Sequence, residues 1–345
     1  MQVFFRTIFC LFSLALSIHS QAAQVSVHDP VMAKEGNIYY LFSTGPGITF
    51  YSSSNMKDWQ PEGRIFAGEP SWARAVAPGF NEHIWAPDIQ FHHGKYYLYY
   101  SVSGFGKNAS GIGVTINKTL NPRSPDYRWE DQGMLLQSIP GRDAWNAIDP
   151  NIITDNKGAG WMSFGSFWSG IKLVKLNDNW TQLAQPQEWR ALAQRARPAL
   201  SSDETAGPAE IEAPFIYKKG EYYYLFVSWG LCCRGAGSTY HLAVGRAKEV
   251  TGPYLDKSGK DMAQGGGSVL LMGNKAWQGL GHNSAYQFDG KDYLVLHAYE
   301  TADKYLQKLK IMEMQWDKEQ WPMVDPRDLD TYQSTLLAPP KSSIK

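Results

Sequence analysis

The sequence predicts an all-β fold, a five-bladed β-propeller, because three features repeat together: a short motif, the order of elements after it, and the spacing of its copies. The motif places an acidic residue or a histidine close to a proline or a serine. The steps from Asp29 through Asp88, Asp149 and Glu212 to His282 are 59, 61, 63 and 70 residues. Four-stranded units repeated in this way are typical of a propeller. The five copies are Val27-His28-Asp29-Pro30, Trp85-Ala86-Pro87-Asp88, Ala147-Ile148-Asp149-Pro150, Ile211-Glu212-Ala213-Pro214 and Gly281-His282-Asn283-Ser284.

Each copy is followed by a predicted hairpin. A glycine comes six to nine residues after the acid or histidine, and an aromatic, apolar strand begins shortly after it. Glycine supplies the positive φ that tight hairpin turns need. The turn glycines are Gly36, Gly94, Gly158, Gly220 and Gly290, and the strands lie at residues 39–42, 96–99, 161–164, 222–226 and 293–296.

A third strand with alternating apolar side chains is predicted at residues 112–116, 171–176, 242–245 and 309–314. A less regular fourth segment tends to carry a tryptophan, as at Trp59, Trp129 and Trp180. Short strands with turn signals also allow a β-sandwich or two stacked domains. The fixed order of elements at a fixed period favours the propeller.

Residues 1–23 are predicted to be a signal peptide, and residues 24–345 a single propeller domain. In the first stretch Arg6 is the only charge, an apolar run extends from Thr7 to Ile18, and Ser20-Gln21-Ala22 offers small residues for cleavage. The run is too short to favour a transmembrane anchor. We therefore expect a secreted or periplasmic protein.

Charge and composition limit the partners that we expect. Without Arg6, 32 basic residues stand against 33 acidic ones, a net charge near −1. This balance argues against nucleic acid or a membrane surface as partner. Aromatic residues make up 14% of the chain, and most are expected in packing within and between blades, with some stacking on sugars. We expect the chain to act as a monomer.

Cys232 and Cys233 are the only cysteines after the signal peptide, and they are adjacent. A disulfide between neighbouring residues would be strained. Two small buried apolar side chains are the alternative. Neither arrangement gives a metal site.

The motif acids are expected to meet, since equivalent positions on the innermost strands of a propeller converge on its axis. Asp29, Asp88, Asp149 and Glu212 would then form one cluster, with His282 facing them. Apolar neighbours could raise the pKa of Glu212 toward that of a general acid. His282 is either a hydrogen-bonded structural residue or, on the axis, a metal ligand or a neighbour that tunes a pKa.

Aromatic residues in Gly- and Ser-rich loops are candidates for stacking on sugar rings. Phe167 and Trp168 lie in such a loop, although one of the two could be tucked under a neighbouring blade. Residues 182–207 are predicted to be an insertion with a short helix around residues 188–196. The predicted substrate-binding residues are Trp85, Phe105, Gly106, Asn146, Ala147, Ile148, Asp149, Ser166, Phe167 and Trp168.

Over nearly its whole length after the signal peptide, the chain resembles glycoside hydrolase family 43, and within it the arabinanases that cut linear α-1,5-linked L-arabinan. The acid motifs would also fit β-xylosidases and arabinofuranosidases of the family. Two further stretches narrow the resemblance to arabinanases. They are Ser166-Phe167-Trp168-Ser169-Gly170 and Cys232-Cys233-Arg234-Gly235, the latter followed by Ser238-Thr239-Tyr240.

The resemblance implies a five-bladed propeller and an inverting hydrolysis. Asp29 matches the general base, Glu212 the general acid, and Asp149 a third carboxylate that tunes the pKa of the acid and orients it. His282 matches a histidine near an axial ion, often calcium. The motifs do not report whether cleavage is endo or exo.

This chemistry agrees with the residues. An inverting glycosidase needs one protonated and one ionised carboxyl group, roughly 6.5–9.5 Å apart. Carboxylates on different blades can face each other across the axis at such a spacing. A third acid beside Glu212 would raise its pKa by like-charge repulsion.

Other functions remain open at this point. A relative acting on xylan or arabinoxylan would share the acid motifs. A carbohydrate-binding propeller without catalysis is disfavoured, since all three acids are present. A sialidase is disfavoured because the Ser-x-Asp-x-Gly-x-Thr-Trp repeat is absent. The sequence His28-Asp29-Pro30 also differs from the Asn-Asp-Pro of retaining fructan-cleaving propellers.

Overall fold

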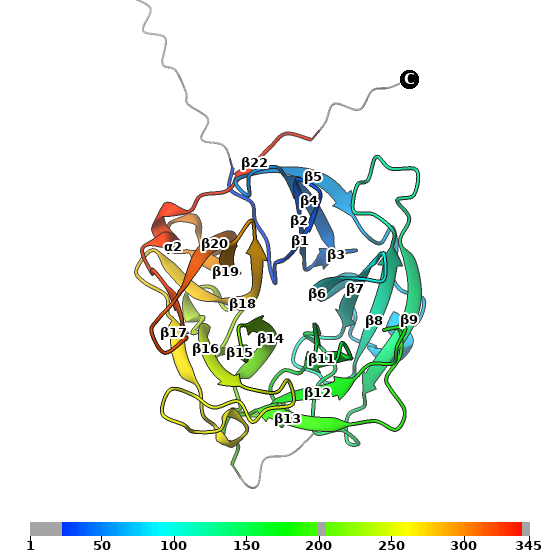
Figure 1. Cartoon of the computed structure of the whole chain (residues 1–345). Helices are drawn as coiled ribbons and strands as arrows, with labels where there is room; N and C mark the ends of the chain where they lie inside the picture. Colours follow the sequence, from blue (N-terminus) through cyan, green and yellow to red (C-terminus); the bar gives the residue numbers. More distant parts are fainter. Residues whose placement is uncertain (1–22, 199–204, 340–345) are drawn as a thin grey trace, which may run out of the picture.

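The computed structural model of the protein describes residues 23–198 and 205–339. The predicted signal peptide lies outside the described residues, except for Ala23. The described chain forms five sheets arranged radially around a common centre (Figure 1). The predicted all-β, five-bladed propeller is confirmed. Among the described residues, no helix is long and apolar enough to cross a membrane.

Blades 1 and 2 are antiparallel meanders that each gain one short strand from elsewhere in the chain. Blade 1 contains β1 (Val31–Glu35), β2 (Ile38–Ser43), β4 (Thr49–Ser53), β5 (Asp58–Arg64) and β22 (Thr335–Leu336). Blade 2 contains β3 (Gly45–Pro46), β6 (His83–His92), β7 (Lys95–Val102), β8 (Ser110–Asn117) and β9 (Glu130–Ser138).

Blades 3, 4 and 5 are four-stranded. Blade 3 contains β10 (Asn151–Thr154), β11 (Gly160–Phe164), β12 (Ile171–Lys175) and β13 (Trp189–Ala193). Blade 4 contains β14 (Ile211–Lys219), β15 (Tyr222–Trp229), β16 (His241–Ala247) and β17 (Ser268–Leu271). Blade 5 contains β18 (Trp277–Phe288), β19 (Lys291–Glu300), β20 (Leu306–Trp316) and β21 (Pro322–Val324).

Helices are few and short in the described chain. They are α1 (Ala73–Val76), α2 (Asp328–Thr331) and the 3₁₀ turns η1 (Gly235–Gly237), η2 (Met262–Gln264) and η3 (Thr301–Asp303).

The first strands of the blades form a closed inner ring, in which β1 contacts β6 and β18, and β14 contacts β10 and β18. The core consists of five apolar clusters, one between each pair of neighbouring blades. Strand β7 shows how the aromatic residues serve this packing. Tyr96 and Tyr100 lie in the cluster shared with blade 1, whereas Tyr97 and Tyr99 lie in the cluster shared with blade 3 because successive strand residues point to opposite faces.

The two ends of the described chain close the ring between blades 1 and 5. Strand β22 pairs with β5 in parallel. Beside it, the Leu336 N–H donates to Ala23 O at 2.7 Å, and the Leu309 N–H of β20 donates to Val25 O at 3.0 Å. The first and last segments of the described chain are therefore hydrogen-bonded to each other.

The motif residues adopt a backbone conformation that the sequence did not reveal. In each unit one residue has a left-handed φ, between 44° and 60°. These residues are Asp29, Ala86, Asp149, Ala213 and His282. In blades 2, 4 and 5 the pairing register also shifts at this point. Such irregularities re-aim side chains and are frequent near active sites.

This finding corrects the predicted equivalence of the acids. Only Asp29, Asp149 and His282 occupy the left-handed position, whereas Glu212 precedes it by one residue and Asp88 follows it by two. Asp88 is buried and accepts a hydrogen bond of 2.7 Å from the Ile152 N–H of blade 3. Asp88 therefore joins two blades and is not a member of the acid cluster.

Two further predictions about blade 3 were wrong. The expected helix around residues 188–196 is replaced there by β13, which pairs with β12. Trp180 lies before this outer strand and stacks on His92 of blade 2 at 3.8 Å between ring centroids. By contrast, all five turn glycines have the expected positive φ, between 58° and 83°.

Candidate active site

Asp29 is a buried carboxylate with partners on both oxygens. The Thr44 hydroxyl, directly after β2, donates to Oδ2 at 2.5 Å. On the other side, the Nδ1 atoms of His28 and His282 lie 2.7 Å and 2.9 Å from Oδ1. Asp29 is only 5% exposed. Burial alone would raise its pKa, but the positive charges of His28 and His282 outweigh burial and hold the pKa well below its ordinary value. Asp29 is therefore ionised at neutral pH.

Asp149 differs from Asp29 in its charge state. The pKa of Asp149 is raised to about 8, and burial is the largest cause. The charges of Glu212 and Asp29 also raise this pKa, whereas the charge of His282 lowers it. The Asp149 Oδ2 accepts a hydrogen bond of 3.0 Å from the Ala213 N–H, in the residue after Glu212. Asp149 thus carries a proton at neutral pH and lies against the backbone that presents Glu212.

Glu212 is half-buried at the start of β14, and its Oε2 accepts a hydrogen bond of 2.6 Å from the Ser166 hydroxyl. The predicted substrate-binding residue Ser166 therefore contacts an acid in this structure. The next residue, Phe167, donates its N–H to Ile211 O at 2.7 Å. These two hydrogen bonds join the loop after β11 to the start of β14. The expected rise in the pKa of Glu212 stays a prediction.

His282 faces the carboxylates from blade 5. Burial lowers its pKa, but the charges of Asp29, Asp149 and Glu212 more than compensate and raise it to about 9. Its backbone N–H donates to the Ser228 hydroxyl at 2.8 Å. The cluster therefore combines an ionised Asp29, a protonated Asp149 and a positively charged His282.

The left-handed residues are anchored by the blade that precedes them. The Asp149 N–H donates to Ser101 Oγ of β7 at 3.1 Å, and the Asp29 N–H donates to His297 Nδ1 of β19 at 3.2 Å. Thr44 Oγ1 receives the Ala86 N–H at 2.8 Å. The anchoring side chains lie within the last four residues of the second strand or directly after it. The sequence reasoning missed them because it compared only the acid motifs, although an alignment of the second strands would have shown polar residues there.

A second group that the sequence reasoning missed lies beside His28. The His28 ring stacks on His297, with 4.0 Å between their centroids, and the Tyr240 ring stacks on the His297 ring at 6.1 Å. The Tyr299 hydroxyl lies 3.1 Å from His28 Nε2. These rings fix the orientation of the imidazole that faces Asp29.

The structure places the predicted sugar-binding residues in different environments. Phe105 is 72% exposed, and Trp85 and Phe167 are half-buried. Trp168 is only 2% exposed, so a sugar ring cannot stack on it as the structure stands. Of the adjacent rings Phe167 and Trp168, Trp168 is therefore the buried one, as the alternative interpretation of this pair allowed.

The loop residues beside Asp149 serve first as structure. Asn146, Ala147 and Ile148 are buried. The Asn146 side-chain amide donates to Lys107 O at 3.2 Å, next to Gly106. The loops of blades 2 and 3 are thereby joined at the site. Contacts of these residues with a sugar stay a prediction.

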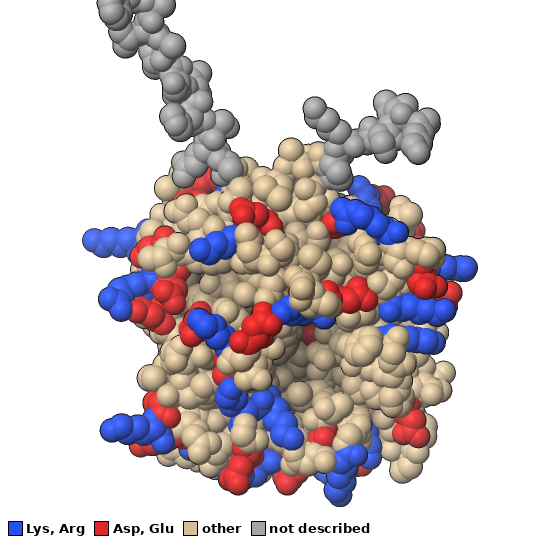
Figure 2. Space-filling view, turned by 45° about the horizontal axis from the view of Figure 1, so that its top comes forward, with Lys and Arg blue, Asp and Glu red and all other residues tan. Residues whose placement is uncertain are grey.

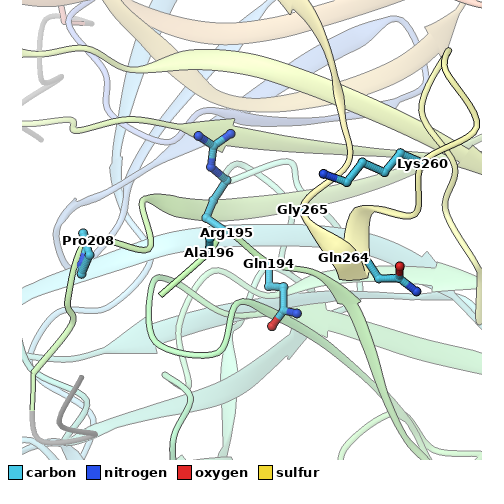
Figure 3. Close-up of a pocket in the computed structure, with 7 residues that line it drawn as sticks. All are labelled: Gln194, Arg195, Ala196, Pro208, Lys260, Gln264 and Gly265. Atoms are coloured by element: carbon cyan, nitrogen blue, oxygen red, sulfur yellow. The ribbon is translucent and has the colours of Figure 1, made fainter. Parts of the chain in front are cut away.

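The face of the molecule seen in Figure 2 carries mixed charge. Figure 2 shows Lys and Arg side chains interspersed with Asp and Glu around a central hollow on one face. A separate cavity of about 570 Å³ lies between the end of β13 and the η2 turn. Figure 3 shows Arg195 and Lys260 among the residues that line it. None of the three candidate catalytic acids lines this cavity, so it is distinct from the acid cluster.

Metal-ligating side chains converge at two places in the described chain. The first group is His28 with Cys232 and Cys233, but these two cysteines form a disulfide and offer no thiolate. The second group is His28 with Asp29 and His297. The predicted metal ligand His282 belongs to neither. Its neighbour Asn283 has a buried side-chain oxygen without a hydrogen-bond partner among the described residues. The residue after His282 therefore has an unpartnered side-chain oxygen that could ligate a cation.

The chain has counterparts among known proteins. Residues 22–322 match the family described as glycosyl hydrolases family 43. This chain belongs to that family. The match includes strands of all five blades, so the family assignment applies to the whole propeller.

Relatives of known name agree with the assignment. The chain is 64% identical to an extracellular exo-α-(1→5)-L-arabinofuranosidase of Cellvibrio japonicus, over 94% of this chain and 93% of the relative. It is 40% identical to an extracellular endo-α-(1→5)-L-arabinanase of Bacillus subtilis, over 87% and 88% of the two chains. The solved structure of an α-L-arabinanase from Cellvibrio cellulosa complexed with arabinohexaose superposes with a TM-score of 0.90 and 65% identity, over 91% of this chain and 100% of that one.

Proposed function

We propose that this chain is an exported glycoside hydrolase that cleaves the α-1,5-L-arabinofuranosidic bonds of linear arabinan with inversion of the anomeric centre. The observation that carries the proposal is the unequal pair formed by Asp29 and Asp149. Asp29 is held ionised by two histidines, whereas burial keeps a proton on Asp149, next to Glu212. The ionised Asp29 is in the state that a general base needs, and the neutral Asp149 is suited to orienting the third carboxyl group, Glu212. The substrate follows from the names of the relatives.

In the proposed reaction Asp29 is the general base. Its Oδ2 is fixed by Thr44 and its Oδ1 by the two imidazoles, so the carboxylate is oriented before substrate binds. It takes a proton from a water molecule, and the water oxygen forms a bond to the anomeric carbon of an arabinofuranosyl unit.

Glu212 is the proposed general acid. Because the Ser166 hydroxyl donates to Oε2, the other oxygen, Oε1, is left to carry the proton. That proton passes to the glycosidic oxygen as its bond to the anomeric carbon breaks. The product therefore has the opposite anomeric configuration.

Asp149 is the proposed orienting group. As a neutral acid near neutral pH it adds no negative charge next to Glu212. Its hydrogen bond from the Ala213 N–H fixes the backbone from which the Glu212 side chain extends. It acts through Glu212 and does not itself exchange a proton with the substrate.

We also propose one calcium ion on the propeller axis, with the Asn283 side-chain oxygen as a ligand and the protonated His282 in contact with it only through water. Calcium takes six to eight oxygen ligands, so water would fill most positions. The unpartnered oxygen of Asn283 fits such an ion. A bound cation would supply positive charge near the carboxyl groups and favour their ionised forms.

Phe105, Phe167 and Trp85 are the proposed sugar-stacking residues, since each has an exposed or half-exposed ring. Export is proposed from the apolar stretch at residues 7–18 and from the two relatives named extracellular. The relatives include both exo and endo enzymes. The length of the first products would show which of the two modes this chain uses.

The test is a substrate panel with product chromatography at early times. We expect the purified protein to cleave debranched linear arabinan much faster than xylan or a nitrophenyl arabinofuranoside. A spread of oligosaccharides would indicate endo action, and one dominant short product exo action. Asp29→Ala and Glu212→Ala serve as controls that should fold but not cleave. Cleavage of xylan in place of arabinan, or near-normal activity of folded Glu212→Ala, would overturn the proposal.

A further inference from the structure

The two adjacent cysteines, whose state the sequence left open, form a disulfide in the loop between β15 and β16. Cys232 is half-buried and Cys233 is exposed. The loop closes on itself, because the Leu231 N–H donates to Thr239 Oγ1 at 3.0 Å and the Thr239 N–H donates to Leu231 O at 2.9 Å. The disulfide therefore lies in an ordered loop.

Cys233 contacts the group that orients the proposed base. Its backbone N–H donates to the Tyr299 hydroxyl oxygen at 3.1 Å, and its Sγ lies 3.5 Å from His28 Nε2. The Tyr299 hydroxyl lies 3.1 Å from the same Nε2. Since His28 Nδ1 is directed at the Asp29 carboxylate, Nδ1 carries a ring proton, and Nε2 is the atom that pairs with the Tyr299 hydroxyl.

These contacts form a short, densely packed chain from the disulfide to Asp29. The His28 ring is held between this chain and the stacked His297 ring. The Tyr299 ring packs so tightly against Gly279 that a Cβ there would clash with it. A shift of Cys233 would therefore move the Tyr299 hydroxyl or the His28 imidazole, and with them the carboxylate that His28 faces.

A role in global stability does not explain the disulfide. The stabilisation from a cross-link grows with the length of chain that it closes. A bond between neighbouring residues closes almost none. Its physical effect is local, because the covalent ring includes the peptide bond between the two cysteines and restricts the backbone that donates to Tyr299.

We propose that the Cys232–Cys233 disulfide is a positioning element for the general base, acting through Tyr299 and His28. The inference rests on the proposed role of Asp29. In the oxidised form the Cys233 N–H and Sγ fix Tyr299 and His28, and His28 fixes Asp29 Oδ1. Reduction to two thiols frees this backbone, and catalysis slows without loss of the fold.

The test compares kcat and KM on linear arabino-oligosaccharides for the enzyme as isolated, reduced with a phosphine under argon, and reoxidised. Thiol titration confirms that two thiols appear on reduction. We expect kcat to fall about tenfold with KM nearly unchanged, as a small misplacement of a catalytic group predicts, and reoxidation to restore it. Cys232→Ser/Cys233→Ser should show the lowered kcat and no response to the phosphine.

Tyr299→Phe keeps the packed ring, removes the hydroxyl and tests the route. If the disulfide acts through this hydroxyl, the variant has a lowered kcat and reduction lowers it little further, because coupled effects are not additive. Full additivity of the two effects would overturn the proposed route. An unchanged kcat in the fully reduced wild type would overturn the inference, and so would a rise in KM alone, which would indicate a substrate contact. Failure of the proposed function is distinguishable, since the oxidised wild type would then not cleave arabinan.

Discussion

The backbone N–H of Ala213 donates a hydrogen bond of 3.0 Å to the buried carboxyl group of Asp149. Through this bond the acid of blade 3 holds the residue that follows Glu212 on blade 4. In the proposed reaction, Asp149 acts on Glu212 through this bond. It fixes the origin of the Glu212 side chain, and its own charge state sets the local field.

Asp149→Asn should alter the pH dependence of stability. Asn keeps an oxygen that accepts from Ala213 but cannot ionise. The pKa of Asp149 is raised from the ordinary 3.8 to about 8 in the folded chain. The stability that its proton confers is complete below pH 4 and is lost as the pH rises toward 8. Relative to wild type, the variant should gain at most about 1.4 kcal/mol per pH unit across this window.

Chemical denaturation at pH 5, 6, 7 and 8 measures this effect. Asp149→Ala is the control, because it loses the hydrogen bond as well and should be less stable than Asp149→Asn at each pH. A stability difference between Asp149→Asn and wild type that does not change with pH would contradict the assignment of a proton to Asp149.

Thr44→Val should impair both activity and stability. The change removes the hydrogen bond to Asp29 Oδ2 and leaves the Ala86 N–H without its acceptor. An unsatisfied buried donor costs about 1–3 kcal/mol, and the loss of one orienting partner should lower kcat about tenfold to a hundredfold. Thr44→Ser keeps the hydroxyl and should stay close to wild type. Equal kcat values for the two variants would show that Thr44 does not orient the base.

Phe105 and Trp168 should respond in opposite ways to replacement by alanine. Phe105 is 72% exposed, so its loss should raise KM for long substrates and leave the melting temperature unchanged. Trp168 is 2% exposed, and its loss should destabilise the fold by about 3–5 kcal/mol. Kinetics on arabino-oligosaccharides of increasing length and thermal melts separate the two effects. A Phe105→Ala variant with wild-type KM at every length would remove Phe105 from the substrate site.

Calcium should copurify with the protein at one ion per chain, as elemental analysis can show. A ligand bound only by the folded chain stabilises it, so a strong chelator should lower the melting temperature and added calcium should restore it. His282→Gln should hold less calcium after dialysis. A wild-type protein free of metal, with full activity and an unchanged melting temperature in chelator, would return His282 to a purely electrostatic and structural role.

The sequence was sufficient to predict the propeller, because each unit repeats a turn glycine and an aromatic strand that packs both of its faces. The repeats also correctly predicted that Asp29, Asp149, Glu212 and His282 lie close together. The predicted alignment of the five units was wrong, because it matched their acidic residues. The units match instead at the left-handed residue, which a proline follows in four of them. This alignment makes Glu212 and Asp88 equivalent to Asp29, although they lie on either side of that position.

Other features depend on contacts distant in sequence. The segment that became β13 has the Ala, Gln and Arg composition of a helix, yet pairing with the open edge of β12 outweighed local propensity. Thr44 and Tyr299 lie outside the acid motifs, so no pattern around Asp29 indicated them. The burial of Trp168 depends on how the loop after β11 packs on its neighbours.

The most direct test of the account is proton NMR of the first products released from linear arabinan. If Asp29 activates water and Glu212 protonates the leaving oxygen, the new reducing ends appear as the β-anomer and only later mutarotate to the α-anomer. Products that appear first as the α-anomer would indicate retention and a covalent intermediate, and would contradict the assignment of Asp29 as a general base.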